Sequence, residues 1–229
     1  MNLNIKFSAA ALGIMSILSF ALNSCGLDNY DAPESRLHGR IVYDGQPLGL
    51  RSTAGAVQLQ LYQYGYAKRD PIPVFVDQNG EFSAQLFSGD YKLVTRDGNG
   101  PWVNSRDTLD IHVEGYTECK LEVTPYFMFG NYSITIENDI IKASAAIEKV
   151  VQDAVIDRVI LAVGETRFVD ESTNIGQINA IPDQEMNIEA SIDITSEAEY
   201  KNARHLFARL GVRAADADQY LFTPVIQLK

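Results

Sequence analysis

The chain has 229 residues, of which 46% are hydrophobic and 21% are charged, so it holds enough apolar side chains for one or two globular cores. Its 30 acidic and 19 basic residues give a net charge of −11 at pH 7. This acidic balance argues against nucleic acid as a partner and against a basic patch that adheres to a membrane surface.

The first 24 residues have the parts of a secretory signal. One lysine, Lys6, precedes an apolar run at 7–22, which is shorter than the roughly 20 residues of a membrane-spanning helix. Ser24 and Cys25 follow the bacterial lipoprotein pattern, in which the signal is cut before a cysteine that carries a diacylglycerol. We therefore expect a signal peptide at 1–24 and acyl chains on Cys25 that hold the protein to a membrane. An uncleaved N-terminal anchor is the alternative.

Beyond the signal, residues 25–36 are polar and acidic and predict a flexible tether. Because Cys25 is assigned to lipid, Cys119 has no partner for a disulfide within the chain. Apolar and polar residues alternate around Cys119, which predicts a buried, unreactive thiol on a strand.

Residues 37–125 alternate between apolar and polar side chains and are interrupted by frequent turns. Within 57–61 the odd positions are apolar and are expected to face a core, with Gln58 and Gln60 facing outward. Short strands joined by such turns predict a β-sandwich or barrel. Three small-residue pairs that tolerate positive φ mark the turns: Asp44-Gly45, Asn79-Gly80 and Asp97-Gly98.

Residues 126–229 form a second expected domain with one ambiguous segment. Between 140 and 163, apolar residues recur at helical spacing, whereas the density of β-branched residues favours strands. We predict strands there, because the tail of the chain alternates clearly.

That tail, at 205–213 and 220–228, is predicted to be a closing hairpin around a polar turn. A short helix is expected within 196–203. The predicted fold class is therefore all-β, with two consecutive β-sandwich domains. In the hairpin, one face is expected to carry Leu206, Ala208 and Leu210 and the other Phe207 and Arg209.

The stretches LHGRIVYDGQPL and VDQNGEFSAQLFSGDYKLV resemble the transthyretin-like, carboxypeptidase-regulatory type of sandwich. The resemblance rests on Gly39 in the first strand, a G-x-P-L turn at 45–48, a D-x-x-G-x-F hairpin at 77–82 and G-x-Y at 89–91. The tail is similar to the last two strands of fibronectin type III-like domains. These resemblances imply a transthyretin-like sandwich followed by an immunoglobulin- or fibronectin-like one, and they imply nothing about activity.

With its lipoprotein signal and the DNYDAPESRLHG opening at 28–39, the whole chain resembles a two-domain lipoprotein family of Bacteroidetes, a domain of unknown function. Members of that family are encoded beside SusC/SusD-type importers. The resemblance implies an accessory protein of the outer membrane that assists nutrient capture by such an importer. Three acids, Asp28, Asp31 and Glu34, are similar to surface-export signals of this group and predict that the protein faces the cell exterior.

Three tyrosines form the first candidate binding surface. Tyr62, Tyr64 and Tyr66 recur at every second position and are expected on one face of a strand. Flat aromatic rings suit the apolar faces of pyranose rings, so this row is a candidate site for a polysaccharide or oligosaccharide. The alternative is that the rings cover a sheet edge or the seam between the domains.

The single tryptophan, Trp102, is the second candidate. It lies at 98–104 in a loop rich in glycine and asparagine. A large ring on such a loop is either a platform for a ligand or a plug that closes the end of the sandwich.

Thr108 is a candidate for glycosylation. The tripeptide Asp107-Thr108-Leu109 resembles the acceptor used for O-glycosylation of surface proteins in Bacteroidetes.

No catalytic constellation stands out in the sequence. The three histidines lie far apart, no serine has the flanking glycines of a nucleophile elbow, and no phosphate-binding loop is present. Acidic pairs such as Asp170-Glu171 can in principle serve a glycosidase, but in a chain with 30 acids we interpret them as solvated loops. The sequence therefore predicts a protein that is not an enzyme and holds no cofactor or metal.

The predicted function is capture of a glycan or another nutrient beside a SusC/SusD-like importer. The alternative is a structural subunit that docks on the importer and binds no ligand of its own. Such a docking subunit is expected to have an exposed apolar patch on its surface. The run at 126–129 is the candidate for this patch if it does not form the seam between the domains.

Overall fold

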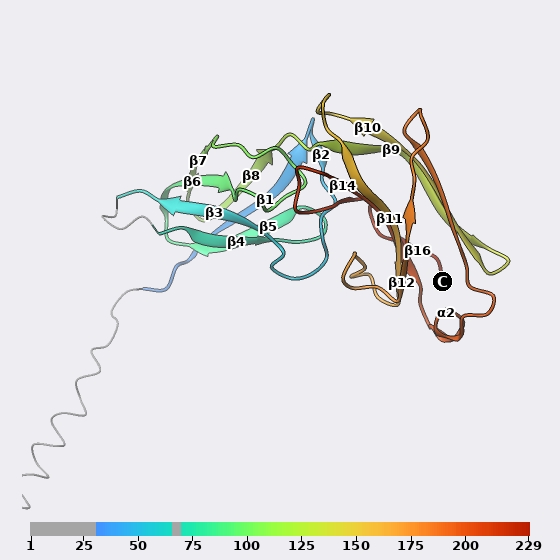
Figure 1. Cartoon of the computed structure of the whole chain (residues 1–229). Helices are drawn as coiled ribbons and strands as arrows, with labels where there is room; N and C mark the ends of the chain where they lie inside the picture. Colours follow the sequence, from blue (N-terminus) through green and yellow to red (C-terminus); the bar gives the residue numbers. More distant parts are fainter. Residues whose placement is uncertain (1–30, 66–69) are drawn as a thin grey trace, which may run out of the picture. The chain divides into compact units, whose positions relative to one another are not determined.

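The computed structural model describes residues 31–65 and 70–229, and Figure 1 traces their path. The segment Pro33–Lys229 forms one compact unit. The predicted signal peptide, Cys25 and Tyr66 lie outside the described residues. Within the described ranges, no helix is long and apolar enough to cross a membrane.

The first domain, as far as it is described, is built on one sheet of eight strands, seven of which follow one hydrogen-bonded path. The order along the path is β2-β1-β5-β4-β3-β6-β7, and β8 runs parallel to β1. In the described residues, β4 and β5 pair at one position, Val76 with Phe82. The hydrogen-bonded pairing is therefore shortest there, and the sheet folds at this point into the two layers of a sandwich. The strands are β1 (Ser35–Tyr43), β2 (Gln46–Pro47), β3 (Val57–Gln63), β4 (Ile72–Val76), β5 (Glu81–Leu86), β6 (Gly89–Thr95), β7 (Leu109–Val113) and β8 (Tyr116–Glu122).

The core of the first domain follows the predicted alternation. Val57, Leu59 and Leu61 of β3 are buried, while Gln58 and Gln60 between them are partly exposed, which confirms the predicted faces of this strand. The predicted turns are confirmed too, because their glycines have positive φ: 73° at Gly45, 74° at Gly80 and 64° at Gly98.

The second domain is also a sandwich, and in its described residues one sheet has three strands and the other five. The first sheet has the order β13-β10-β9, and the second has the order β12-β11-β14-β15 with β16 also paired to β14. The all-β fold of two consecutive sandwich domains is thereby confirmed. The elements are β9 (Phe127–Glu137), β10 (Ile140–Lys149), β11 (Ile156–Gly164), β12 (Gly176–Ala180), β13 (Asn187–Asp193), α2 (Ala198–Asn202), β14 (Phe207–Ala214), β15 (Leu221–Phe222) and β16 (Ile226–Gln227).

The ambiguous segment at 140–163 contains β10 and most of β11, which confirms the predicted strands, and residues 150–155 connect the two. β11 lies between β12 and β14, and all of its residues from 159 to 163 are buried. A strand that is buried on both faces has apolar residues at nearly every position. Such a continuous run also contains apolar residues at helical spacing, which explains the ambiguity in the sequence. The helix expected within 196–203 is α2, and the predicted tail hairpin pairs β14 with β15 and β16.

The aromatic run at 126–129 packs inside the molecule. Phe127 is buried, and Tyr126, Met128 and Phe129 are half-buried against the core. The Tyr126 N–H donates to the carbonyl of Pro101 in the first domain, and the Tyr126 carbonyl accepts from Val150 N–H in the second. The run is therefore part of the seam between the domains and is not the exposed patch that a docking subunit needs.

Gly39 on β1 provides a test of this packing. A Cβ atom at this position would overlap the ring of Phe82 and lie 2.8 Å from Cys119 Sγ. We expect Gly39→Ala to lower the free energy of unfolding by about 1–3 kcal/mol, because a close-packed strand cannot take up the extra methyl group. Chemical denaturation measures this change. Ser83→Ala on the exposed face of the neighbouring β5 is the control, and equal midpoints for both variants would contradict the prediction.

Candidate functional site

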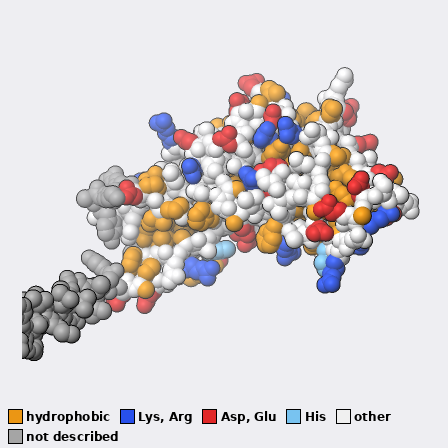
Figure 2. All heavy atoms as spheres, turned by 60° about the horizontal axis from the view of Figure 1, so that its bottom comes forward, with side chains coloured by type: hydrophobic (Ala, Val, Ile, Leu, Met, Phe, Trp, Pro, Cys, Tyr) orange, Lys and Arg blue, Asp and Glu red, His pale blue; other side chains and the backbone are white. Residues whose placement is uncertain are grey.

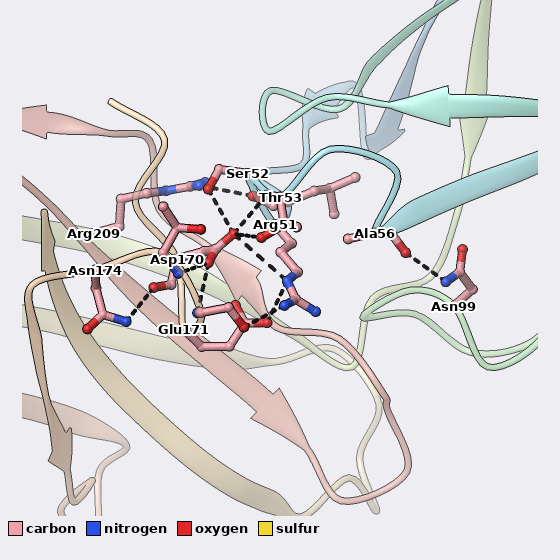
Figure 3. Close-up of polar contacts among 12 residues, drawn as sticks. Arg51, Ser52, Thr53, Ala56, Asn99, Asp170, Glu171, Asn174 and Arg209 are labelled. Atoms are coloured by element: carbon pink, nitrogen blue, oxygen red, sulfur yellow. Dashed lines mark hydrogen bonds and ion pairs between the residues drawn. The ribbon is translucent and has the colours of Figure 1, made fainter. Parts of the chain in front are cut away.

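A buried carboxylate lies where the two domains meet (Figure 3). Asp170 follows β11 in the second domain, and its side chain is fully buried. Its Oδ2 accepts hydrogen bonds from Ser52 Oγ at 2.8 Å, Thr53 Oγ1 at 2.7 Å and Thr53 N–H at 2.8 Å, all on the first-domain loop between β2 and β3. Its Oδ1 accepts from the backbone N–H groups of Ser172 at 2.8 Å and Thr173 at 2.7 Å. One carboxylate thus joins two loops that are distant in sequence.

The negative charge of Asp170 is stabilised by these donors. Burial by itself raises the pKa of the Asp170 carboxyl, but the hydrogen bonds from Thr53, Ser52 and the two backbone N–H groups outweigh it, so the pKa is lowered. Burial raises the pKa of the neighbouring Glu171, although Arg51 Nε lies 2.8 Å from its Oε1. The interpretation of this acidic pair as a solvated loop is wrong, because the first domain covers it.

A buried arginine links the domains a second time. Arg209 on β14 donates from Nε to the carbonyl of Thr223 at 2.7 Å and from Nη1 to the carbonyl of Leu50, in the first domain, at 2.9 Å. Its guanidinium carbon lies 4.6 Å from the centre of the Phe222 ring. Burial lowers the pKa of Arg209 to about 10, and the carboxylate of Asp170 acts in the opposite direction, so the side chain is still protonated at neutral pH.

These two links position the walls of an open groove with a volume of about 820 Å³. One wall comes from Ser52, Ala54 and Gly55, and Ser52 is a partner of Asp170. A second wall comes from residues 167–168, just before Asp170, and a third from residues 224–225, directly after the Arg209 partner Thr223. Side chains of β1, β4 and β5 complete the groove. The junction therefore sets the shape of the groove.

Two exposed phenylalanines and one buried amide line this groove. Phe75 on β4 is 55% exposed and Phe168 is 56% exposed. Large apolar rings are usually buried, so two of them in one groove indicate a binding surface. Gln78 is 9% exposed, and its Oε1 has no hydrogen-bond partner among the described residues. This oxygen is closed to solvent, so a hydroxyl group of a ligand can supply the missing donor once the amide turns toward the groove.

The hydrophobic side chains on the surface are not evenly spread. Figure 2 shows one face, on which they gather over the first domain, with basic side chains and a histidine beside them. Apolar and basic groups therefore adjoin on this face.

The structure places Trp102 in the core. The residue is 2% exposed, and its ring covers Gly100, where a side chain would overlap it. Its backbone forms an isolated bridge with Pro125, at the end of the first domain. Of the two roles considered for Trp102, the geometry fits the plug that closes the end of the sandwich. The buried ring offers no platform to a ligand.

Tyr62 and Tyr64 do not line the groove. Lys92 lies opposite Tyr62 in the β3–β6 register, and its Nζ lies 5.4 Å from the centre of the Tyr64 ring, so both tyrosines are near one lysine. The Tyr64 hydroxyl donates to Asp110 Oδ1 at 3.2 Å. The two rings form a separate polar and aromatic surface, for which glycan binding stays a prediction, while Tyr66 lies outside the described residues.

The two other predicted residues lie on or next to the edge strands of the first domain. Thr108 is exposed just before β7, with Lys92 Nζ 3.3 Å from its hydroxyl, and its glycosylation stays a prediction. Cys119 on β8 is a free thiol that is only partly buried, and burial raises its pKa to about 11. The thiol is therefore protonated, and unreactive as a nucleophile, at neutral pH.

Across residues 31–65 and 70–229, no group of three or more His, Cys, Asp or Glu side chains is arranged to hold a metal ion. The groove is lined by aromatic rings, an amide, guanidinium groups and two carboxylates. These groups are suited to reversible binding of a polar ligand.

Two family models match the chain. One, described as "Protein of unknown function (DUF3823) N-terminal domain", matches residues 35–124, and the other, "Domain of unknown function (DUF3823_C)", matches residues 127–227. The chain belongs to the DUF3823 family. The two DUF3823 matches meet between β8 and β9, where the two sandwiches join.

Solved structures of DUF3823 proteins have the same fold. One from Parabacteroides merdae is 48% identical, with a TM-score of 0.83 over 87% of this chain and 100% of the other. One from Bacteroides ovatus is 34% identical, with a TM-score of 0.76 over 85% and 98% of the two chains. A structure from Bacteroides uniformis, described as a "putative carbohydrate binding protein", is 16% identical, with a TM-score of 0.72 over 86% and 99%. A search of curated proteins finds no match.

The Asp170 junction predicts a large effect of a small change. Asp170→Asn keeps the size of the side chain but turns an NH₂ group toward donors that now bind a carboxylate oxygen. We expect it to lower the free energy of unfolding by about 3 kcal/mol. Asp153→Asn is the control, because Asp153 is exposed. Denaturant titration of both variants measures the difference, and similar midpoints would contradict the role of Asp170.

The same carboxylate predicts sensitivity to acid. The pKa of Asp170 is lower in the folded protein than in an unfolded chain, where it is about 3.9. The stability that Asp170 contributes is therefore complete above the unfolded value and is lost as the pH falls through the folded value. Acidification should destabilise the wild type more than Asp170→Asn in thermal melts at neutral and acidic pH. Equal losses of stability in the wild type and in Asp170→Asn on acidification would contradict the role of Asp170 in this acid sensitivity.

Proposed function

We propose that this protein is a lipid-anchored accessory protein of the outer membrane that captures a glycan, or a related nutrient, for a SusC/SusD-like importer. The groove at the domain junction is the proposed binding site. Phe75 and Phe168 offer rings on which the apolar faces of pyranoses can pack, and the Gln78 amide can accept a hydrogen bond from a hydroxyl when it turns toward the groove. This combination of exposed rings with a buried, unpartnered amide carries the proposal.

The junction supports a binding role because it holds the groove in one shape. The Asp170 hydrogen bonds to Ser52 and Thr53 connect two of the walls, and the Arg209 bonds hold the third. A preformed site loses little conformational entropy when a ligand binds.

The comparisons agree with a binding protein and leave its ligand open. Both family descriptions give the function as unknown. The Bacteroides uniformis structure of the same fold is described as a "putative carbohydrate binding protein", and that description makes glycans the first ligands to test.

The membrane and importer parts of the proposal rest on the sequence. The Ser24 and Cys25 pattern supplies the lipid anchor, and the acidic tether is similar to surface-export signals, so the two domains would face the cell exterior. The importer is proposed from the family resemblance. A docking subunit without a ligand has less support, because the run at 126–129 lies in the seam.

Loss of either ring in the groove should weaken glycan binding. We expect Phe75→Ala and Phe168→Ala each to lower the affinity about threefold to tenfold, since each removes one stacking surface. Isothermal titration calorimetry with plant, fungal and host polysaccharides measures the affinity of each protein.

Phe87→Ala is the matched control, because Phe87 is an exposed ring outside the groove. Thermal melting of each variant shows whether it is folded. Equal affinities for all three variants would move the site away from the groove, and a wild type that binds no glycan would contradict the proposed function.

A further inference from the structure

The acidic side chains of the groove are already engaged. Asp77 and Glu81 both line it. Asp77 Oδ1 accepts hydrogen bonds from the backbone N–H groups of Asn79 and Glu81, each at 2.8 Å. The Glu81 carboxylate forms an ion pair with Arg40. Arg40 therefore opposes the charge of Glu81, and the Asp77 carboxylate is held by backbone N–H groups of its own turn.

The arginine side chains of the groove are not engaged. Arg36 on β1 and Arg167 in the loop after β11 are exposed and line the groove from different domains. Neither guanidinium has an ion-pair or hydrogen-bond partner in the described part of the chain. In a protein with a net charge of −11, these two guanidinium groups are cations in the groove that are available to bind an anion.

We infer that this groove selects glycans that carry anionic substituents, such as the carboxylate of a uronic acid or a sulfate ester. The inference rests on the proposed function and adds the class of ligand to it. Guanidinium groups bind such oxyanions through two parallel hydrogen bonds, while Phe75 and Phe168 remain available for the sugar rings. The acidic remainder of the surface repels the same ligands, which favours the groove as the point of contact.

The test compares two forms of one sugar in calorimetric titrations of the full chain in detergent micelles. Oligogalacturonates and their methyl esters have the same rings, with and without the negative charge. We expect the charged form to bind about tenfold more tightly or better, and its binding to weaken as salt is added. A sulfated oligosaccharide and a neutral glucan complete the series.

Arginine variants locate the effect. Arg36→Gln and Arg167→Gln should each lower the affinity for the charged form about tenfold and leave the affinity for the methyl ester unchanged. Arg106→Gln should change neither affinity, because Arg106 is exposed and lies outside the groove. All three substitutions lie on the surface and are expected to leave the fold intact.

Each outcome decides the inference. Arginine-dependent binding of the sulfated sugar supports it and identifies sulfate as the source of the anion. Equal affinity for the charged and esterified sugars overturns it, while binding that still needs Phe75 leaves the proposed function standing. Charged-sugar binding that neither Arg36→Gln nor Arg167→Gln weakens also overturns it. If no glycan binds, whether charged or neutral, both the inference and the proposed function are overturned.

Discussion

The Asp170 carboxylate is buried between two β-sandwiches, and a buried charge is costly unless its oxygens are hydrogen-bonded. Two of its donors, at Ser172 and Thr173, come from its own loop, and the others come from Ser52 and Thr53 in the first domain. The charge is fully satisfied only when both domains are in place. Arg209 works in the same way, since its partner carbonyl at Leu50 belongs to the first domain. Correct docking of the domains is therefore coupled to the stability of each loop.

The groove follows from this coupling. One wall begins at Ser52, which donates to Asp170, and the other two lie just before Asp170 and directly after the Arg209 partner Thr223, so the junction sets their positions. Phe75 and Gln78 come from the first domain and Phe168 from the second, which means that neither domain alone contains the proposed site. A pair of small sandwiches with short loops can in this way build one binding surface that each lacks separately.

Local patterns explain which parts of the fold were predictable. The alternation at 57–61 and the glycines at the turns depend on neighbouring residues, and both are confirmed. Part of the Asp170 site also has a local signature, because an aspartate followed by Ser172 and Thr173 is typical of a turn in which the carboxylate accepts backbone N–H groups. The partner loop has no such signature, since Ser52 is 118 residues away from Asp170.

By itself, the sequence determined the all-β class, two consecutive domains, the strands within 140–163 and the closing hairpin, because strand periodicity is a property of adjacent residues. The tertiary structure alone decided which side chains are buried at the junction. Alternation assigned Arg209 to the face opposite Leu206, yet both are buried, because the first domain covers the outer face of β14. Likewise, the loop sequence around Trp102 does not distinguish a ligand platform from a plug. Trp102 is a plug because segments from elsewhere in the chain pack over its ring. Burial depends on partners from elsewhere in the chain, and local sequence does not encode them.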